Sequence, residues 1–186
     1  GSSPFSEVTP VGKPNVGKTQ LRIEEARRFV QAALNDYETH RRPLALAAVM
    51  ALTMGLRARE TLQRKVRDLD DDCGILWIDS GKTRNAKRHL RTPEFVRPHL
   101  RELVGNQSQD AYLFVSERSG RPVRHPSLWI AVQRLCLAAG VTAVCTHSLR
   151  GLYATLAVES GALSETVASS LGHGSFAMTE KHYAQA

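Results

Sequence analysis

Two polar residues near the end of the chain, His147 and Arg150, lie three positions apart in a segment that otherwise has the pattern of short apolar helices. This spacing places both side chains on one face at the start of a helix, where backbone amides also favour an anion. An arginine fork binds two phosphate oxygens, and a histidine can donate a hydrogen bond to another. The pair therefore indicates a phosphate site, although it equally suits residues that cap or bridge neighbouring helices.

Further along, His173 stands between two glycines, and Tyr183 follows it by ten residues. Because glycine has no side chain, a ring at this position can approach a ligand closely. The same pattern is typical of a loop that ends a helix, and a tyrosine near a chain end is usually a docking aromatic residue. Both interpretations stay open while each residue is considered alone.

Another candidate lies far upstream, where Arg57 follows a long apolar segment and Glu60 follows Arg57 by three residues. An arginine at the end of a buried helix is either a cation that caps the helix or a charge that is held at a site. Composition alone favours the cap.

The middle of the chain changes from a helical to an extended pattern. Residues 74–79 have the composition of a strand, residues 80–85 that of a basic turn, and residues 87–93 that of a second, edge strand. The sequence therefore predicts one small antiparallel hairpin. Its positive charges suit contact with a nucleic-acid backbone or protection of an exposed strand edge. The residues concerned are Lys82 and, as candidates for DNA contact, Arg84, Lys87 and Arg88.

Taken together and in order, five motifs resemble the active-site motifs of the tyrosine recombinases, the phage integrase family. The resemblance covers about residues 20–185. It implies the catalytic-domain fold of that family, which is mainly α-helical with a small antiparallel β-hairpin (α+β). The motifs are Gly55-Leu56-Arg57-x-x-Glu60, Gly81-Lys82, His147-x-Leu149-Arg150, Leu171-Gly172-His173 and Tyr183.

The resemblance also implies a role for each catalytic residue. Arg57 and Arg150 would clamp the scissile phosphate, and Glu60 would support the first arginine from behind. Lys82 would act as the general acid towards the leaving 5′ oxygen. Tyr183 would attack the phosphate to give a 3′-phosphotyrosyl bond.

Two histidines would assist, with His147 and His173 supplying proton transfer and hydrogen bonds. A phenol with a pKa of about 10 is ionised to only about one part in a thousand at pH 7, a deficit of about 4 kcal/mol. The arginines and a nearby histidine offset this deficit because they favour the phenolate and spread the charge that develops on phosphorus.

One departure from the family pattern concerns the nucleophile. The interval from His173 to Tyr183 is one residue longer than in many family members, and His182 is the added neighbour. Histidine does not replace tyrosine in this chemistry, so Tyr183 is kept, and we expect it to be displaced from the other site residues without DNA. Tyr153 is the alternative tyrosine, but its apolar surroundings predict a core residue.

The implied function is that of a site-specific DNA recombinase or integrase that cleaves and rejoins strands. Because the phosphotyrosyl bond conserves the energy of the phosphodiester, no metal, ATP or other cofactor is expected. Two alternatives are a type IB topoisomerase, which uses a similar residue set, and a basic DNA-binding module without catalysis.

A competing motif occurs at residues 12–19, which match the G-x-x-x-x-G-K-[ST] pattern of a phosphate-binding loop. That mechanism requires a buried strand before the loop, whereas the preceding segment contains Pro4 and Pro10 and no apolar run. We interpret the match as a coincidence within a linker.

Charge and composition favour a nucleic-acid partner. The 186 residues include 25 Lys and Arg against 18 Asp and Glu, a net charge of +7, and such an excess favours a polyanion, with an acidic membrane as the second candidate. No apolar run is as long as a membrane span, which needs about 18 residues. We therefore expect a soluble cytoplasmic protein associated with the nucleoid. Three cysteines without a C-x-x-C pair predict reduced, mostly buried thiols.

Apolar periodicity predicts the elements that must position these residues. Residues 1–19 have the composition of a cloning remnant and an interdomain linker, and residues 20–186 form the expected catalytic domain. An extended piece is predicted at 111–115. Helices are predicted at 23–37, 43–52, 95–104, 127–139, 149–159, 163–171 and 177–183.

Family members usually carry an N-terminal helical domain that clasps DNA and a C-terminal helix that docks on a neighbouring subunit. Neither is recognised in this sequence, so we expect an excised catalytic domain that binds double-stranded DNA weakly and in a salt-sensitive way. The resemblance implies a homo-tetramer on DNA for the full-length protein, while this chain alone is expected to be a monomer in solution.

Overall fold

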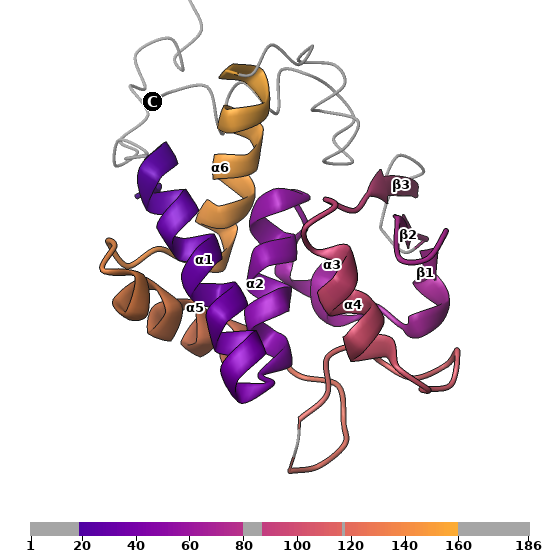
Figure 1. The fold of residues 1–186 in the computed structure, drawn as a ribbon. Coiled ribbons are helices and arrows are strands. Elements are labelled where there is room, and N and C mark those ends of the chain that lie inside the picture. Colours follow the sequence, from indigo (N-terminus) through magenta and orange to yellow (C-terminus); the bar gives the residue numbers. More distant parts are fainter. Residues whose placement is uncertain (1–18, 80–86, 117, 160–186) are drawn as a thin grey trace, which may run out of the picture.

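The computed structural model describes residues 19–79, 87–116 and 118–159 (Figure 1). Within these ranges the chain is mainly helical, with a small antiparallel sheet at one edge. The predicted helices at 163–171 and 177–183 lie outside the described residues. The elements are α1 (Ile23–His40), α2 (Pro43–Thr53), α3 (Ala58–Leu62), η1 (Val66–Asp68), β1 (Leu69–Asp70), β2 (Ile75–Ile78), β3 (Arg88–Arg91), α4 (Arg97–Val104), α5 (His125–Ala139) and α6 (Thr146–Glu159).

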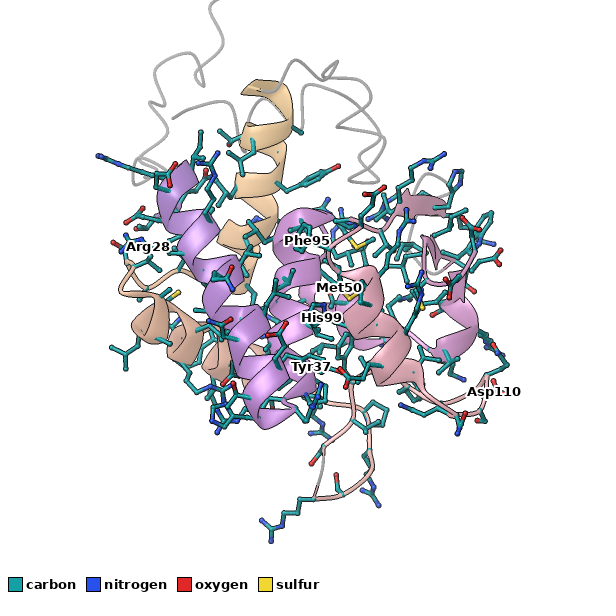
Figure 2. The ribbon with its side chains drawn as sticks, in the orientation of Figure 1. Arg28, Tyr37, Met50, Phe95, His99 and Asp110 are labelled. Carbon is teal, nitrogen blue, oxygen red and sulfur yellow. The ribbon has the colours of Figure 1, made fainter. Side chains whose placement is uncertain are left out.

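The core is built around α2, which the sequence predicted as an apolar helix with Pro43 at its start. Proline suits the first turn because its missing N–H has no partner there in any helix. Every residue from 45 to 52 is buried, and α1, α5 and α6 pack around the helix (Figure 1). Met50 is fully buried and lies on the side of α2 that faces α4 (Figure 2). The prediction of a central, surrounded helix is confirmed.

The predicted first helix is also confirmed as α1, which buries one stripe that includes Phe29 and Tyr37. Its first turn is capped where the Glu25 carboxylate accepts the Arg22 N–H at 2.8 Å. Near its end the Tyr37 ring meets His99 of α4 edge to face, with 5.8 Å between ring centroids (Figure 2). The contact fixes α4 against α1.

The sheet has the order β1-β2-β3, and both pairs are antiparallel. The predicted hairpin is confirmed as β2 and β3, although each strand is shorter than expected. The prediction of one hairpin alone missed β1. That strand is only two residues long, and the acidic run that contains it leaves the extended conformation at Asp71, where φ is +49°.

Other elements follow the predictions with shifted bounds. The helix predicted from residue 127 begins at His125 and ends before Gly140, whose φ of +60° closes it. The helix predicted from residue 149 begins at Thr146. The piece predicted at 111–115 makes only isolated bridges, from Tyr112 to Lys65 and from Val115 to Pro122.

The three cysteines are free, as predicted. Cys73 and Cys136 are buried, and burial raises the pKa of both thiols. Across the described parts of the chain, no helix combines the length and apolarity of a membrane span.

Candidate active site

The end of α2 sets the position of Arg57. Gly55 has a φ of +64°, a left-handed conformation that favours glycine and turns the chain out of the helix. Leu56 is fully buried and anchors the turn. Arg57 then becomes the N-cap of α3 with a side chain that is 44% exposed. The order Gly-Leu-Arg thus ends a buried helix and brings a cation to the surface.

Glu60, at the third position of α3, binds Arg57 twice. Its Oε2 accepts the Arg57 backbone N–H at 2.9 Å, and its Oε1 accepts Arg57 Nη1 at 2.8 Å. The first bond is half of a capping box. A spacing of three residues therefore fixes the backbone and the guanidinium of the same arginine.

Arg150 reaches this position from α6. Its side chain is 1% exposed, and its Nη1 donates to the Gly55 carbonyl and lies 3.8 Å from Glu60 Oε2. Arg57 and Arg150 are far apart in the sequence. The fold brings both to one carboxylate.

A third arginine, Arg88 of β3, completes the group. Its Nη2 and Nη1 donate to Glu60 Oε2 and Oε1 at 3.1 and 3.3 Å, and its side chain is 7% exposed. Arg88 lies opposite Ile78 in the register and two residues before Leu90, on the face of the sheet that packs on the core. We call Glu60 with Arg57, Arg88 and Arg150 the Glu60 centre.

Electrostatics keep the Glu60 centre charged. Burial alone would raise the pKa of Glu60, but the hydrogen bonds and charges of Arg88 and Arg57 outweigh it and hold that pKa below its ordinary value of 4.5. The three arginines around one carboxylate leave an excess of positive charge. Such an excess suits an anionic ligand.

Arg64 fixes the segment that carries Glu60. This arginine is 2% exposed, and its Nε donates to the Glu60 carbonyl at 2.7 Å while Nη1 donates to the Trp77 carbonyl at 2.9 Å. Asp68 provides a counter-charge at 3.1 Å. The arginine therefore ties α3 to β2. Sequence reasoning missed it because an arginine in a charged stretch has the pattern of a solvated residue.

His147 is exposed at the second position of α6, on the turn that leads to Arg150. Next to it, Thr146 is buried and its hydroxyl lies 3.1 Å from Nε2 of His125, the first residue of α5. The start of α6 is thereby joined to α5. This contact holds the segment that carries His147.

The remaining predicted site residues divide into two groups. Lys82, Arg84, His173 and Tyr183 lie outside the described residues. Lys87, the residue directly before β3, is exposed. Tyr153, predicted to be a core residue, is only half-buried and lines an apolar cavity of about 760 Å³ together with α1 residues. In the ranges that the structure describes, no cluster of three or more His, Cys, Asp or Glu could hold a metal.

A second concentration of positive charge lies at the opposite end of α2. An open cavity of about 660 Å³ lies between the start of α2, the loop after α4 and the first turns of α5, and this loop projects at the bottom of Figure 1. Asp36 accepts hydrogen bonds from two of its arginines, Arg42 at 2.8 Å and Arg134 at 2.9 Å. We call this open cavity the basic cavity, and the arginines that line it are Arg42, Arg118, Arg121, Arg124 and Arg134.

Comparison with known proteins identifies the family of this arrangement. The model of the phage integrase family matches residues 19–186. The chain is 28% identical over 158 residues to tyrosine recombinase XerA of Thermococcus kodakarensis, covering 83% of this chain and 55% of that protein. It is 30% identical over 184 residues to the putative integrase/recombinase y4qK of Sinorhizobium fredii, covering 96% and 56%. The chain thus spans about half the length of the curated relatives that it matches.

Solved structures share the fold. The crystal structure of XerA recombinase superimposes with a TM-score of 0.77 at 24% identity, covering 94% of this chain and 61% of that one. The Tn1549 transposon integrase in complex with a circular intermediate DNA superimposes with a TM-score of 0.75 at 20% identity, covering 95% and 64%. The mainly helical fold with a small antiparallel sheet, predicted from the sequence, is confirmed.

Proposed function

We infer, because this chain belongs to the phage integrase family, that it is the catalytic domain of a site-specific DNA recombinase or integrase. The domain would cleave and rejoin DNA through a 3′-phosphotyrosyl intermediate. The observation that carries this proposal is the meeting of Arg57 and Arg150 at the Glu60 carboxylate. Paired guanidinium groups on a rigid support suit a phosphodiester whose charge increases in the transition state.

The two arginines would contact the phosphate from different depths. Arg57, with 44% of its side chain exposed, is the outer group, and Arg150, at 1%, is the inner one. Glu60 orients both, so little reorganisation is needed when charge develops. His147, exposed at the start of α6, would donate a hydrogen bond to the same phosphate.

The reaction itself would use residues that the family resemblance assigns. Tyr183 gives its phenolic proton to His173 as its oxygen attacks phosphorus and forms a new O–P bond, while the bond from phosphorus to the 5′ oxygen breaks. Lys82 gives its proton to that leaving oxygen, and His173 donates a hydrogen bond to the phosphate. Attack by the 5′ hydroxyl of a partner strand reverses these steps. The phosphodiester energy is conserved, so we propose that neither ATP nor a metal takes part.

The proposed partner is double-stranded DNA. The basic cavity would hold the duplex backbone at a distance from the cleavage point, at the other end of α2, because Arg118, Arg121 and Arg124 are exposed arginines that line it. Assembly as a homo-tetramer on DNA and association with the nucleoid are part of the same proposal. Arg84 and Lys87 would add backbone contacts from the hairpin.

The test is formation of a covalent adduct. A pool of nicked duplexes with randomised flanks traps the cleaved strand, because the short fragment downstream of the nick diffuses away. We expect a denaturant-stable protein–DNA adduct with the unmodified chain and none with Tyr183→Phe. An adduct that survives this substitution would refute the nucleophile. Binding of duplex without any adduct would favour a non-catalytic DNA-binding module.

Joining separates the proposal from the topoisomerase alternative. A recombinase transfers the covalently held strand to a second duplex that carries a free 5′ hydroxyl, whereas a topoisomerase of this chemistry mainly reseals the same strand. We expect joined products with two labelled duplexes. Relaxation of supercoiled DNA without joined products would favour the alternative.

A further inference from the structure

Arg88 lies where a DNA-contacting residue would not be expected. Its side chain is 7% exposed, and both of its terminal nitrogens donate to the two oxygens of Glu60. Alternation along β3 places it on the same face as buried Leu90, while His89 and Arg91 on the other face are exposed. The guanidinium of Arg88 therefore binds a group inside the protein, the Glu60 carboxylate.

The two oxygens of Glu60 are shared in an ordered way. Oε1 accepts Arg57 Nη1 and Arg88 Nη1. Oε2 accepts the Arg57 backbone N–H and Arg88 Nη2, and lies 3.8 Å from Arg150 Nη1. The planar fork of Arg88 spans both oxygens and thus fixes the plane of the carboxylate. The directions in which Arg57 and Arg150 are held depend on that plane.

We propose that Arg88 is a positioning residue, which holds the Glu60 carboxylate in the plane that aligns Arg57 and Arg150 on the scissile phosphate. This inference rests on the proposed strand-cleavage function. It also connects the hairpin to the arginine pair, since Lys82 precedes Arg88 by six residues in the sequence. Arg88 acts through Glu60 and does not itself bind DNA.

Alternative anchoring of the carboxylate is weak. Without Arg88, Glu60 keeps the bonds to Arg57, which caps the same short helix, and the longer 3.8 Å approach of Arg150 Nη1. The carboxylate is only 9% exposed, so water does not easily replace the lost partner. The expected result is a carboxylate that turns, and an arginine pair that is present but misaligned.

The experiment compares Arg88→Met with Arg91→Met, a matched change on the exposed face of the same strand. Adduct formation on the nicked duplex is followed in a single turnover at saturating DNA. Arg88→Met is expected to lower the rate constant about 10- to 100-fold, as losses of supporting partners do at other sites, with the burst amplitude kept. Arg91→Met is expected to stay within about two-fold of the unmodified chain.

The amplitude and the rate constant of adduct formation distinguish a positioning role of Arg88 from an effect on folding. A merely structural role would lower the amplitude, which counts competent molecules, and would leave the rate constant of those molecules intact. That result would overturn the proposal. Arg88→Lys, which keeps the charge without the fork, should recover part of the rate and serves if Arg88→Met folds poorly. Full recovery by lysine would overturn the role of the fork.

The affinity for duplex DNA tests separately whether Arg88 contacts DNA. Measured in the Tyr183→Phe background, the Kd of the duplex should change less than about two-fold on Arg88→Met. A large rise in Kd with an unchanged rate constant would make Arg88 a DNA contact and would overturn the inference.

A measurement without DNA keeps this inference distinct from the proposed function. Arg88→Met and Glu60→Gln should shift the urea midpoint non-additively, because they remove the two halves of one contact. Additive shifts would overturn the pairing. If no adduct forms with the unmodified chain but the shifts are non-additive, the proposed function fails and the pairing of Arg88 with Glu60 stands.

Discussion

Two carboxylates at opposite ends of α2 are both largely buried and each collect three basic side chains, but these basic partners differ in burial. Asp36, beside the basic cavity, meets His40, Arg42 and Arg134, whose side chains are 41–51% exposed. Glu60 meets Arg88 and Arg150, which are 7% and 1% exposed, and the more open Arg57. The same kinds of charge therefore stand in water at one end and in the protein interior at the other.

This difference assigns different tasks to the two ends. The charges of exposed arginines are screened by salt and their ion pairs are weak, so they contribute to the attraction of a polyanion and little to geometry. Buried arginines on a shared carboxylate are fixed in direction, and their interactions are strengthened by the low local dielectric. The Glu60 centre is thus suited to chemistry, and the basic cavity to affinity.

The largest expected effect is on catalysis at the Glu60 centre. Arg150→Lys keeps the charge but loses the planar fork that donates to the Gly55 carbonyl and that, in the proposed function, would bind the scissile phosphate. We expect the single-turnover cleavage rate to fall about 10²- to 10³-fold. Arg59→Lys, an exposed arginine of α3, is the matched control. A comparable loss in both variants would contradict the assignment.

Stability should separate the two carboxylates next. Glu60→Ala leaves buried arginines without their carboxylate and is expected to cost about 3 kcal/mol of unfolding free energy. Asp36→Ala removes a carboxylate from exposed partners and should cost about 1 kcal/mol or less. Urea denaturation of both variants measures the difference. Equal losses would show that burial does not distinguish the two ends.

Affinity should respond at the basic cavity. Replacing Arg121 by Gln is expected to raise the Kd for duplex DNA roughly five-fold at 0.15 M salt and to lower the slope of log K against log salt by about 0.9. Titrations at several salt concentrations measure both quantities. An unchanged slope would exclude a phosphate contact by Arg121.

The smallest effect concerns pH. The pKa of Glu60 is lower in the folded chain than its ordinary value of 4.5, so its stabilisation is complete above that value and is lost as pH falls through the folded pKa. The unfolding free energy of the unmodified chain should therefore decline more steeply below about pH 4.5 than that of Glu60→Gln. If the unfolding free energies of the two chains decline in parallel below about pH 4.5, Glu60 has the same pKa in the folded and the unfolded chain.

Local patterns allowed much of the fold to be predicted. The apolar run after Pro43 predicted the central helix, and the period change at residues 74–93 predicted the hairpin, because both signals depend on neighbours in the sequence. The bounds of α5 and α6 were less accurate because their first turns contain polar residues that fit a loop equally well. The short β1 gave no periodic signal at all.

The sequence allowed only part of the Glu60 centre to be predicted. The resemblance in motif order indicated Arg57, Glu60 and Arg150, but it did not indicate that Arg88 contacts Glu60, and the interpretation of Arg88 as a DNA contact stays a prediction. Alternation from Leu90 could have placed Arg88 on the buried face of β3. That signal is weak in a strand where four of five residues from 87 to 91 are polar.

The sequence by itself determined which side chains are available and which helices and strands carry them, since propensity and periodicity act over a few residues. Only the tertiary structure decided which arginines share a buried carboxylate and which remain in solvent. Those partners come from α3, β3 and α6, and the distances between such elements depend on how the whole core packs. The same residue type is therefore part of a buried site at one end of α2 and an exposed surface charge at the other.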